Sequence, residues 1–152
     1  MNKSLLYRSF IECIGTSILS LTIITSRNST LSLVETSTFI GLTLCFLIHL
    51  FGRISGAHFN PLVTLMFMQL QHGNGWYKKK SLLIRSISYI LFQLAGSLSV
   101  FLTFPLNEID NSITGVNLVS EGILTFIFLS LIKTWREEGK ICPESRPLSG
   151  IV

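Results

Sequence analysis

An Asn-Pro pair at positions 60 and 61 interrupts the longest apolar block of the sequence. Asn is a favoured helix N-cap, and Pro is favoured at the first helical position, where its missing N–H costs nothing. The sequence therefore predicts a new helix from Pro61 to Leu70, about 15 Å long, which is half of a ~30 Å hydrocarbon core. Its unpaired N–H groups and positive dipole end would point at the bilayer centre. Broken backbone at that depth must line a cavity or be buried in protein.

Two carboxyl groups lie inside apolar segments, at Glu12 and Glu121. Carboxyls in a membrane are costly and usually face a bundle interior or water, although a carboxyl near a helix end can also snorkel to the surface. Each Glu is followed four residues later by a Thr, at Thr16 and Thr125. The two copies of this weak repeat are separated by three predicted helices. The second copy would therefore have inverted topology, as in proteins built from inverted repeats.

Other chemistry is poorly supported by the residue types. His49 and His58 have no third ligand at a spacing that suits a metal, so no metal site is predicted. The three cysteines, Cys13, Cys45 and Cys142, also lack metal-ligand spacing and are interpreted as small hydrophobic residues. There is no nucleophile–base pair and no phosphate-binding loop, so we predict neither an enzyme nor a cofactor.

The composition indicates a membrane protein that crosses the bilayer several times. The 152 residues are 48% hydrophobic and only 13% charged, which is typical of one polytopic membrane domain. The net charge of +4 comes from residues that are not interleaved with aromatics, so a nucleic-acid partner is not expected. The positive balance is instead typical of the cytoplasmic loops of membrane proteins.

The apolar pattern predicts an all-α chain. A signal peptide is an alternative for the first segment, but Glu12 would lie inside its apolar region. We expect a surface connection over about 71–80, whose Trp76 and Tyr77 fit an interfacial belt. Ala95 and Ser99 form a small-xxx-small pair for close helix contact. The predicted helices cover about residues 5–25, 37–51 with some added length from 34–36, 61–70, 84–104 and 116–132.

The distribution of Lys and Arg predicts the orientation. With the N-terminus inside, only Arg27 of the 12 Lys and Arg residues falls outside. This positive-inside bias places both termini in the cytoplasm and lets the loop from Gly52 to Phe59 enter from that side. The inside residues are Lys3, Arg8, Arg53, Lys78, Lys79, Lys80, Arg85, Lys133, Arg136, Lys140 and Arg146.

The stretch from Ser55 to Thr64, Ser-Gly-Ala-His-Phe-Asn-Pro-Leu-Val-Thr, resembles the first signature loop of the aquaporin and glycerol-facilitator family, the major intrinsic proteins. Supporting matches are the early Glu of the first and last predicted helices, Gly41-Leu42-Thr43, and Gln93 with Gly96. The resemblance covers the N-terminal part of that fold. It implies four spanning helices and one re-entrant half-helix in a single domain over residues 1–152, with a first repeat over about 1–105 and the start of a second over about 116–152. A complete member has six spanning helices and two half-helices that meet head to head.

The resemblance also implies roles for individual residues. Asn60, at the start of the half-helix, would orient a passing water and break the chain of waters that a proton needs. Carbonyl groups of Gly56, Ala57 and His58 would form a ladder of acceptors. Glu12 and Glu121 would brace the signature loops, and Ile40 would lie at the selectivity constriction.

Two substitutions and one absence distinguish the chain from the usual pattern. Leu62 follows Asn60 and Pro61 where Ala is usual, and Ile40 replaces the aromatic residue of water-selective members. The remaining prolines follow Phe104, Cys142 and Arg146, so there is no second Asn-Pro pair and no selectivity Arg after one. The resemblance implies a truncated channel of the cell membrane that passes water or small neutral solutes, as a homo-oligomer such as a tetramer or with a complementary C-terminal half. The alternative is a fragment or membrane scaffold that does not conduct.

Overall fold

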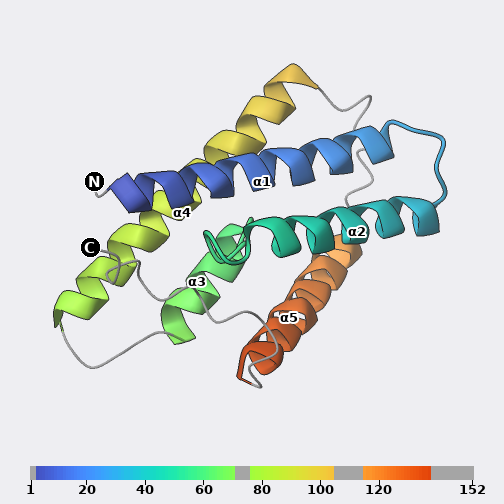
Figure 1. The fold of residues 1–152 in the computed structure, drawn as a ribbon. Coiled ribbons are helices and arrows are strands. Elements are labelled where there is room, and N and C mark those ends of the chain that lie inside the picture. Colours follow the sequence, from blue (N-terminus) through green and yellow to red (C-terminus); the bar gives the residue numbers. More distant parts are fainter. Residues whose placement is uncertain (1–2, 71–75, 105–114, 138–152) are drawn as a thin grey trace. The chain divides into compact units, whose positions relative to one another are not determined.

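The structure is a computed structural model that describes residues 3–70, 76–104 and 115–137. In this part of the chain it contains helices and connecting turns: α1 (Lys3–Arg27), α2 (Leu33–Phe51), α3 (Pro61–Leu70), α4 (Trp76–Thr103) and α5 (Gly115–Glu137) (Figure 1). The chain divides into two units, residues 1–106 and 107–152, so α1–α4 and α5 are described separately. The all-α architecture agrees with the prediction from the sequence.

Three of the described helices are long and apolar enough to cross a membrane. These spans are Lys3–Arg27, Leu33–Phe51 and Lys80–Thr103, and α5 carries a shorter apolar stretch, Gly122–Thr134. The half-helix α3 has the predicted bounds. The start of α4 differs from the prediction, because Trp76 to Lys80 are helical rather than part of a surface connection. A polar turn at the end of a long apolar helix has the same composition as a surface loop, so the pattern did not separate them.

The first unit is organised around α1, which packs against both α2 and α4, while α3 packs against α4 (Figure 1). Hydroxyl pairs cross between α1 and α4, with oxygen–oxygen distances of 2.8 Å for Ser9 and Ser88 and 3.3 Å for Ser20 and Ser97. At Gly96, an added Cβ would lie 2.5 Å from the carbonyl oxygen of Cys13. The two backbones therefore approach closely at a glycine, as small residues permit in membrane bundles.

The predicted contact pair of Ala95 and Ser99 is wrong, because both residues are on the exposed side of α4. The helix period explains the difference. The residues of α4 that are buried near this level are Gln93, Gly96 and Val100, spaced by three and four residues, and they define the face that carries the contact.

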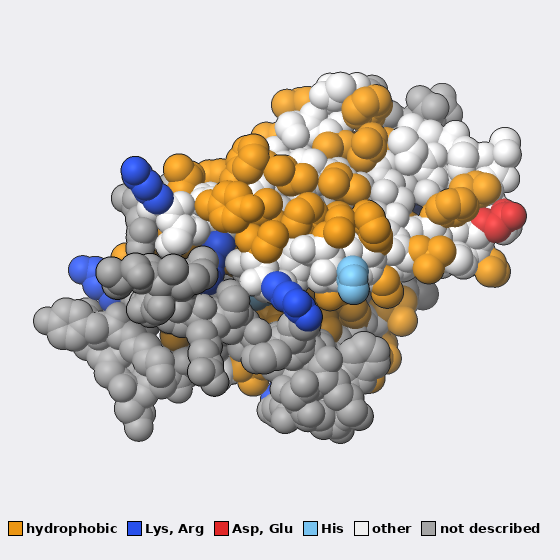
Figure 2. Space-filling view, viewed as in Figure 1, with side chains coloured by type: hydrophobic (Ala, Val, Ile, Leu, Met, Phe, Trp, Pro, Cys, Tyr) orange, Lys and Arg blue, Asp and Glu red, His pale blue; other side chains and the backbone are white. Residues whose placement is uncertain are grey.

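Large apolar side chains cover much of the outer surface of the first unit. On α2, Leu33 is 83% exposed and Val34 is 75% exposed, while Leu102 near the end of α4 is 73% exposed. Figure 2 shows apolar side chains spread over one face of the molecule, with only scattered charged groups among them. A surface of this kind is suited to lipid rather than water, since soluble proteins rarely expose contiguous apolar area of this extent.

Candidate functional site

The predicted loop begins as a continuation of α2. The backbone N–H of Gly52 donates to the carbonyl of Ile48 at 2.9 Å, and that of Ser55 donates to Phe51 at 3.0 Å. The chain then enters the left-handed region at Gly56 (φ 98°), Ala57 (φ 49°) and Phe59 (φ 48°). Left-handed backbone is uncommon for residues with a Cβ, and it is a true outlier for a bulky aromatic. Such a conformation persists only where the surrounding structure imposes it.

The carboxylate of Glu12 on α1 lies at the centre of this loop and is fully buried. Its Oε1 accepts hydrogen bonds from the Ser55 hydroxyl at 2.6 Å and from the backbone N–H of His58 at 3.1 Å. Its Oε2 accepts from the backbone N–H of Phe59 at 2.7 Å and from the Gln93 amide at 2.8 Å. A carboxylate removed from solvent needs such donors, and the loop amides need an acceptor. The same four bonds therefore satisfy Glu12 and fix the loop on α1 and α4.

Helix α4 holds the loop from a second side. The Tyr89 hydroxyl donates to the carbonyl of Ser55 at 2.7 Å, and Tyr89 is fully buried. The amide nitrogen of Gln93 lies 3.1 Å from the hydroxyl of Thr64 on α3, so Gln93 bridges α1, α3 and α4. Tyr89 and Gln93 are four residues apart and share one face of α4.

His58 is buried between α3 and α4. Its Nδ1 lies 3.2 Å from the Thr64 hydroxyl, and its ring stacks on that of Phe67 with centroids 4.5 Å apart. The Tyr89 ring meets it edge-on at 5.4 Å. His58 is thus part of the packing that fixes the loop.

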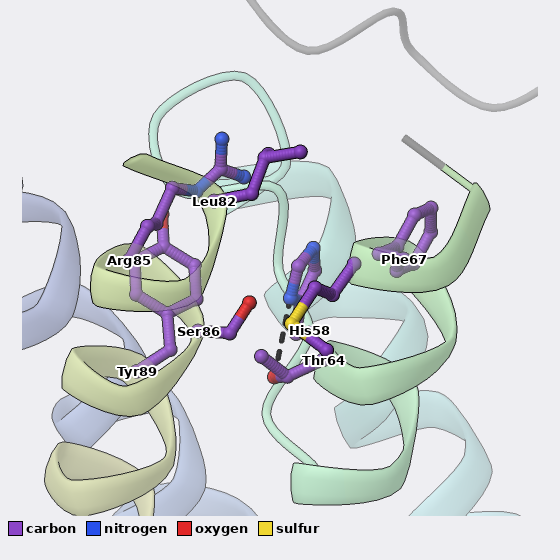
Figure 3. A pocket seen from close by; sticks show the side chains of 8 residues that line it. His58, Thr64, Phe67, Leu82, Arg85, Ser86 and Tyr89 are labelled. Atoms are coloured by element: carbon purple, nitrogen blue, oxygen red, sulfur yellow. Dashed lines mark hydrogen bonds between the residues drawn. The ribbon is translucent and has the colours of Figure 1, made fainter. Parts of the chain in front are cut away.

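A small cavity lies beside His58, between α3 and α4 (Figure 3). Its volume is about 10 Å³, which is room for about one water molecule. The Arg85 guanidinium lies at its edge, 5.3 Å from the centre of the Tyr89 ring, at cation–π distance. The cavity is too small for a continuous solute path. It is lined by His58, Thr64, Phe67, Met68, Leu82, Arg85, Ser86 and Tyr89.

Asn60 and Pro61 start α3 as the residue types predict. The backbone N–H of Leu62 donates to Asn60 Oδ1 at 2.8 Å, which is the bond of an N-cap. Oδ1 accepts from the helix, which leaves the NH₂ end of the amide as a donor for another group. Asn60 is partly exposed and Leu62 is 49% exposed, so the start of α3 is open on one side.

The structure brings Glu12 together with the loop from Gly56 to Leu62, but it leaves two other predicted residues apart. Ile40 lies on α2, partly buried and outside the hydrogen-bonded cluster. The side chain of Glu121, on α5, lies outside the described residues. Sequence reasoning did not assign roles to Ser55, Thr64, Tyr89 or Gln93. The spacing of Tyr89 and Gln93 was the available signal, since two polar residues on one face of an apolar helix indicate a buried contact.

Comparison with known proteins supports the same assignment. The family model described as Major intrinsic protein matches residues 4–149. No curated protein and no solved structure matches the chain. The family match covers nearly the whole sequence, and its members are membrane channels for water or small solutes. The chain has three membrane-length helices and a short helix that begins after the Asn60 cap, and by the family match it belongs to the major intrinsic protein family.

Proposed function

We propose that α1–α4 form one half of a membrane pore for water or small neutral solutes, with Asn60 at its midpoint. The observation that carries this proposal is the orientation of the Asn60 amide. Its Oδ1 is engaged by the N–H of Leu62, so its donor end is directed away from α3. A donor at the positive end of a short helix can orient a water molecule or a hydroxyl group.

This arrangement favours neutral solutes over cations. The N-terminus of α3 carries the positive end of the helix dipole, and no carboxylate of the described residues other than Glu12 takes part in the surrounding cluster. Glu12 is fully buried and its two oxygens are occupied by four donors, so a cation at Asn60 would face the positive end of α3 and the Asn60 donor, whereas water can turn its oxygen toward them. Water held in this orientation cannot pass a proton along an unbroken chain.

The remaining residues receive their roles from the same proposal. Carbonyl groups of Gly56, Ala57 and His58 would accept hydrogen bonds from the solute as it approaches Asn60. Ile40 would narrow the pore from α2, and Leu62 would meet the opposing half. Glu121 would brace that half as Glu12 braces this one.

The opposing half would come from outside these 152 residues. The sequence has one Asn-Pro pair, whereas the family pore needs two half-helices that enter from opposite sides. A second copy of this chain would insert in the same orientation, because nearly all of its Lys and Arg residues favour the cytoplasm. It would then present its half-helix from the same side. We therefore favour a different polypeptide segment as the partner. The same distribution of Lys and Arg would place both termini of this chain in the cytoplasm.

Osmotic shrinkage of proteoliposomes tests this function. We expect liposomes with this chain alone to match empty liposomes in water permeability. Liposomes that hold this chain together with the C-terminal half of a well-characterised family member should have a higher water permeability than empty liposomes and than liposomes with this chain alone. Asn60→Ala should remove the increase, while Gln69→Ala, at the exposed far end of α3, should retain it.

The two halves and each variant must be shown to insert, by resistance to carbonate extraction. With insertion established, permeability of the combined halves equal to that of empty liposomes would contradict the channel function and favour the non-conducting scaffold. Permeability of the chain alone above that baseline would contradict the half-pore proposal.

A further inference from the structure

The ring of Phe59 sits directly on Gly15 of α1. A Cβ added at Gly15 would lie 2.1, 2.4 and 2.6 Å from three ring carbons of Phe59. These distances are shorter than real Cβ contacts allow. The space above Gly15 is therefore completely used by this ring, and no residue with a side chain fits there without moving it.

Gly15 follows Glu12 by three residues, so both face the loop from one side of α1. The two residues hold Phe59 in different ways. Glu12 accepts the backbone N–H of Phe59 at 2.7 Å, while Gly15 receives the ring. Both contacts act on a residue with φ 48°, the conformation that a bulky side chain normally avoids.

The other sides of the ring are also occupied. Phe59 is 3% exposed and forms a buried cluster with Leu47 and Ala57. The Phe51 ring meets it edge-on, with centroids 6.2 Å apart. The ring therefore has little room to move away from α1, and a displacement would pass to the backbone of the next residue, Asn60.

We propose that Gly15 is a positioning residue for Asn60, which acts by seating the Phe59 ring and so fixing the left-handed backbone before the α3 cap. The pore role of Asn60 rests on the proposed function, whereas the seating itself does not. The chain contains a matched site for comparison: Gly41 on α2 is also helical, and a Cβ added there meets nothing within 4 Å.

Amide hydrogen exchange of the full chain in lipid nanodiscs tests the proposal. The Phe59 amide reports on the bond to Glu12, and the Leu62 amide reports on the bond to Asn60 Oδ1. In Gly15→Ala we expect both amides to exchange about tenfold faster or more. Gly41→Ala should leave them unchanged. Ala is a better helix former than Gly, so an effect of helix propensity alone would protect α1 in Gly15→Ala and α2 in Gly41→Ala, and would not speed exchange in either variant.

Removal of the ring separates seating from general destabilisation. Phe59→Ala should also speed exchange at Leu62, and adding Gly15→Ala to it should have no further effect, because the clash is gone. The same acceleration by Gly15→Ala with and without the ring would overturn the proposal, as would unchanged exchange in Gly15→Ala. If Gly15→Ala does not accumulate in folded form, recovery of folded protein in the double variant supports the proposal, and its failure overturns it.

The exchange measurement needs no conduction. A chain that shows this exchange pattern but does not conduct with an opposing half would refute the proposed function and leave the seating intact. Conduction combined with unchanged exchange in Gly15→Ala would refute the seating alone.

Discussion

Helices α1 and α2 lie against one another and are both long enough to cross a membrane, yet they bury different kinds of residue. The buried positions of α1 are mainly small or polar, and they include Ser9, Glu12, Gly15 and Thr16. The only fully buried residue of α2 is the apolar Leu47. Helix α1 therefore contributes specific hydrogen bonds and close contacts, while α2 contributes one apolar contact line and an outer surface suited to lipid.

This difference has a physical origin. In a bilayer, apolar side chains gain little by leaving lipid for a protein interior, so specificity comes from polar partners and from close backbone approach. Helix α1 has both, at Glu12 and at the Gly96 contact. Substitutions on the loop-facing side of α1 and on its partner α4 should consequently have large effects, and substitutions on the outer side of α2 should have small ones.

The largest effect is expected for Glu12→Ala. It leaves the buried amides of His58 and Phe59 and the Gln93 side chain without their acceptor. Loss of buried bonds to a charged group costs about 3 kcal/mol or more. Unfolding by SDS titration in mixed micelles measures the loss, and a stability within error of wild type would contradict the bracing role.

Gly96→Ala should rank second. The added methyl would lie 2.5 Å from the Cys13 carbonyl oxygen, which is backbone and has to shift with the whole of α1. Overpacking of this kind destabilises by about 1–3 kcal/mol. The same titration on Gly41→Ala is the control, where the open site predicts a stabilisation of about 0.5–1 kcal/mol. If Gly96→Ala and Gly41→Ala changed the free energy of unfolding in the same direction, the α1–α4 contact would not differ from the open site on α2 as we predict.

Tyr89→Phe tests how α4 holds the loop, and we expect a smaller loss of stability than in the two variants above. It keeps the ring beside His58 but removes the hydroxyl that donates to the Ser55 carbonyl. We expect a loss of about 1–2 kcal/mol, because a buried carbonyl is left without its partner. Limited proteolysis should show faster cleavage within the loop from Gly52 to Phe59. Unchanged cleavage would indicate that Glu12 alone holds the loop.

The smallest effect is expected at the start of α2. Ser32 and Glu35 form a reciprocal capping box, with the Ser32 N–H donating to Glu35 Oε2 at 2.8 Å. Ser32→Ala should speed amide exchange about threefold in the first turn of α2 and leave the signature loop unchanged. Faster exchange at His58 or Phe59 in this variant would show that α2 is coupled to the loop after all.

The sequence was sufficient for the features that depend on local chemistry. Asn60-Pro61 predicted the start of α3, because capping preferences act within one turn. The apolar lengths predicted four spanning helices, since bilayer thickness sets a minimum span. Among the described residues α1, α2 and α4 have membrane length, whereas α5 carries only the shorter apolar stretch Gly122–Thr134. The start of α4 was placed too late, because Lys78 to Lys80 have the composition of a loop although their backbone is helical.

Features that depend on contacts between distant residues were not predicted from one sequence. The seat of the Phe59 ring on Gly15 joins residues 44 positions apart, and nothing in the local pattern distinguishes Gly15 from Gly41. The donation from Tyr89 to Ser55 was missed for the same reason. The bracing role of Glu12 came from family resemblance, which supplies the long-range information that propensity lacks. The matching role for Glu121 stays a prediction.

The central claim is that one carboxylate on α1 holds the loop that positions Asn60. Amide exchange at His58 and Phe59 in Glu12→Gln tests it most directly, because Gln keeps the size of Glu and can accept at only one of its two terminal atoms. Glu35→Gln is the matched control on α2. We predict exchange at least about tenfold faster at one of these amides or at both in Glu12→Gln, because they donate to different oxygens of Glu12, and no change at either in Glu35→Gln. Unchanged exchange at both amides in Glu12→Gln would contradict the claim.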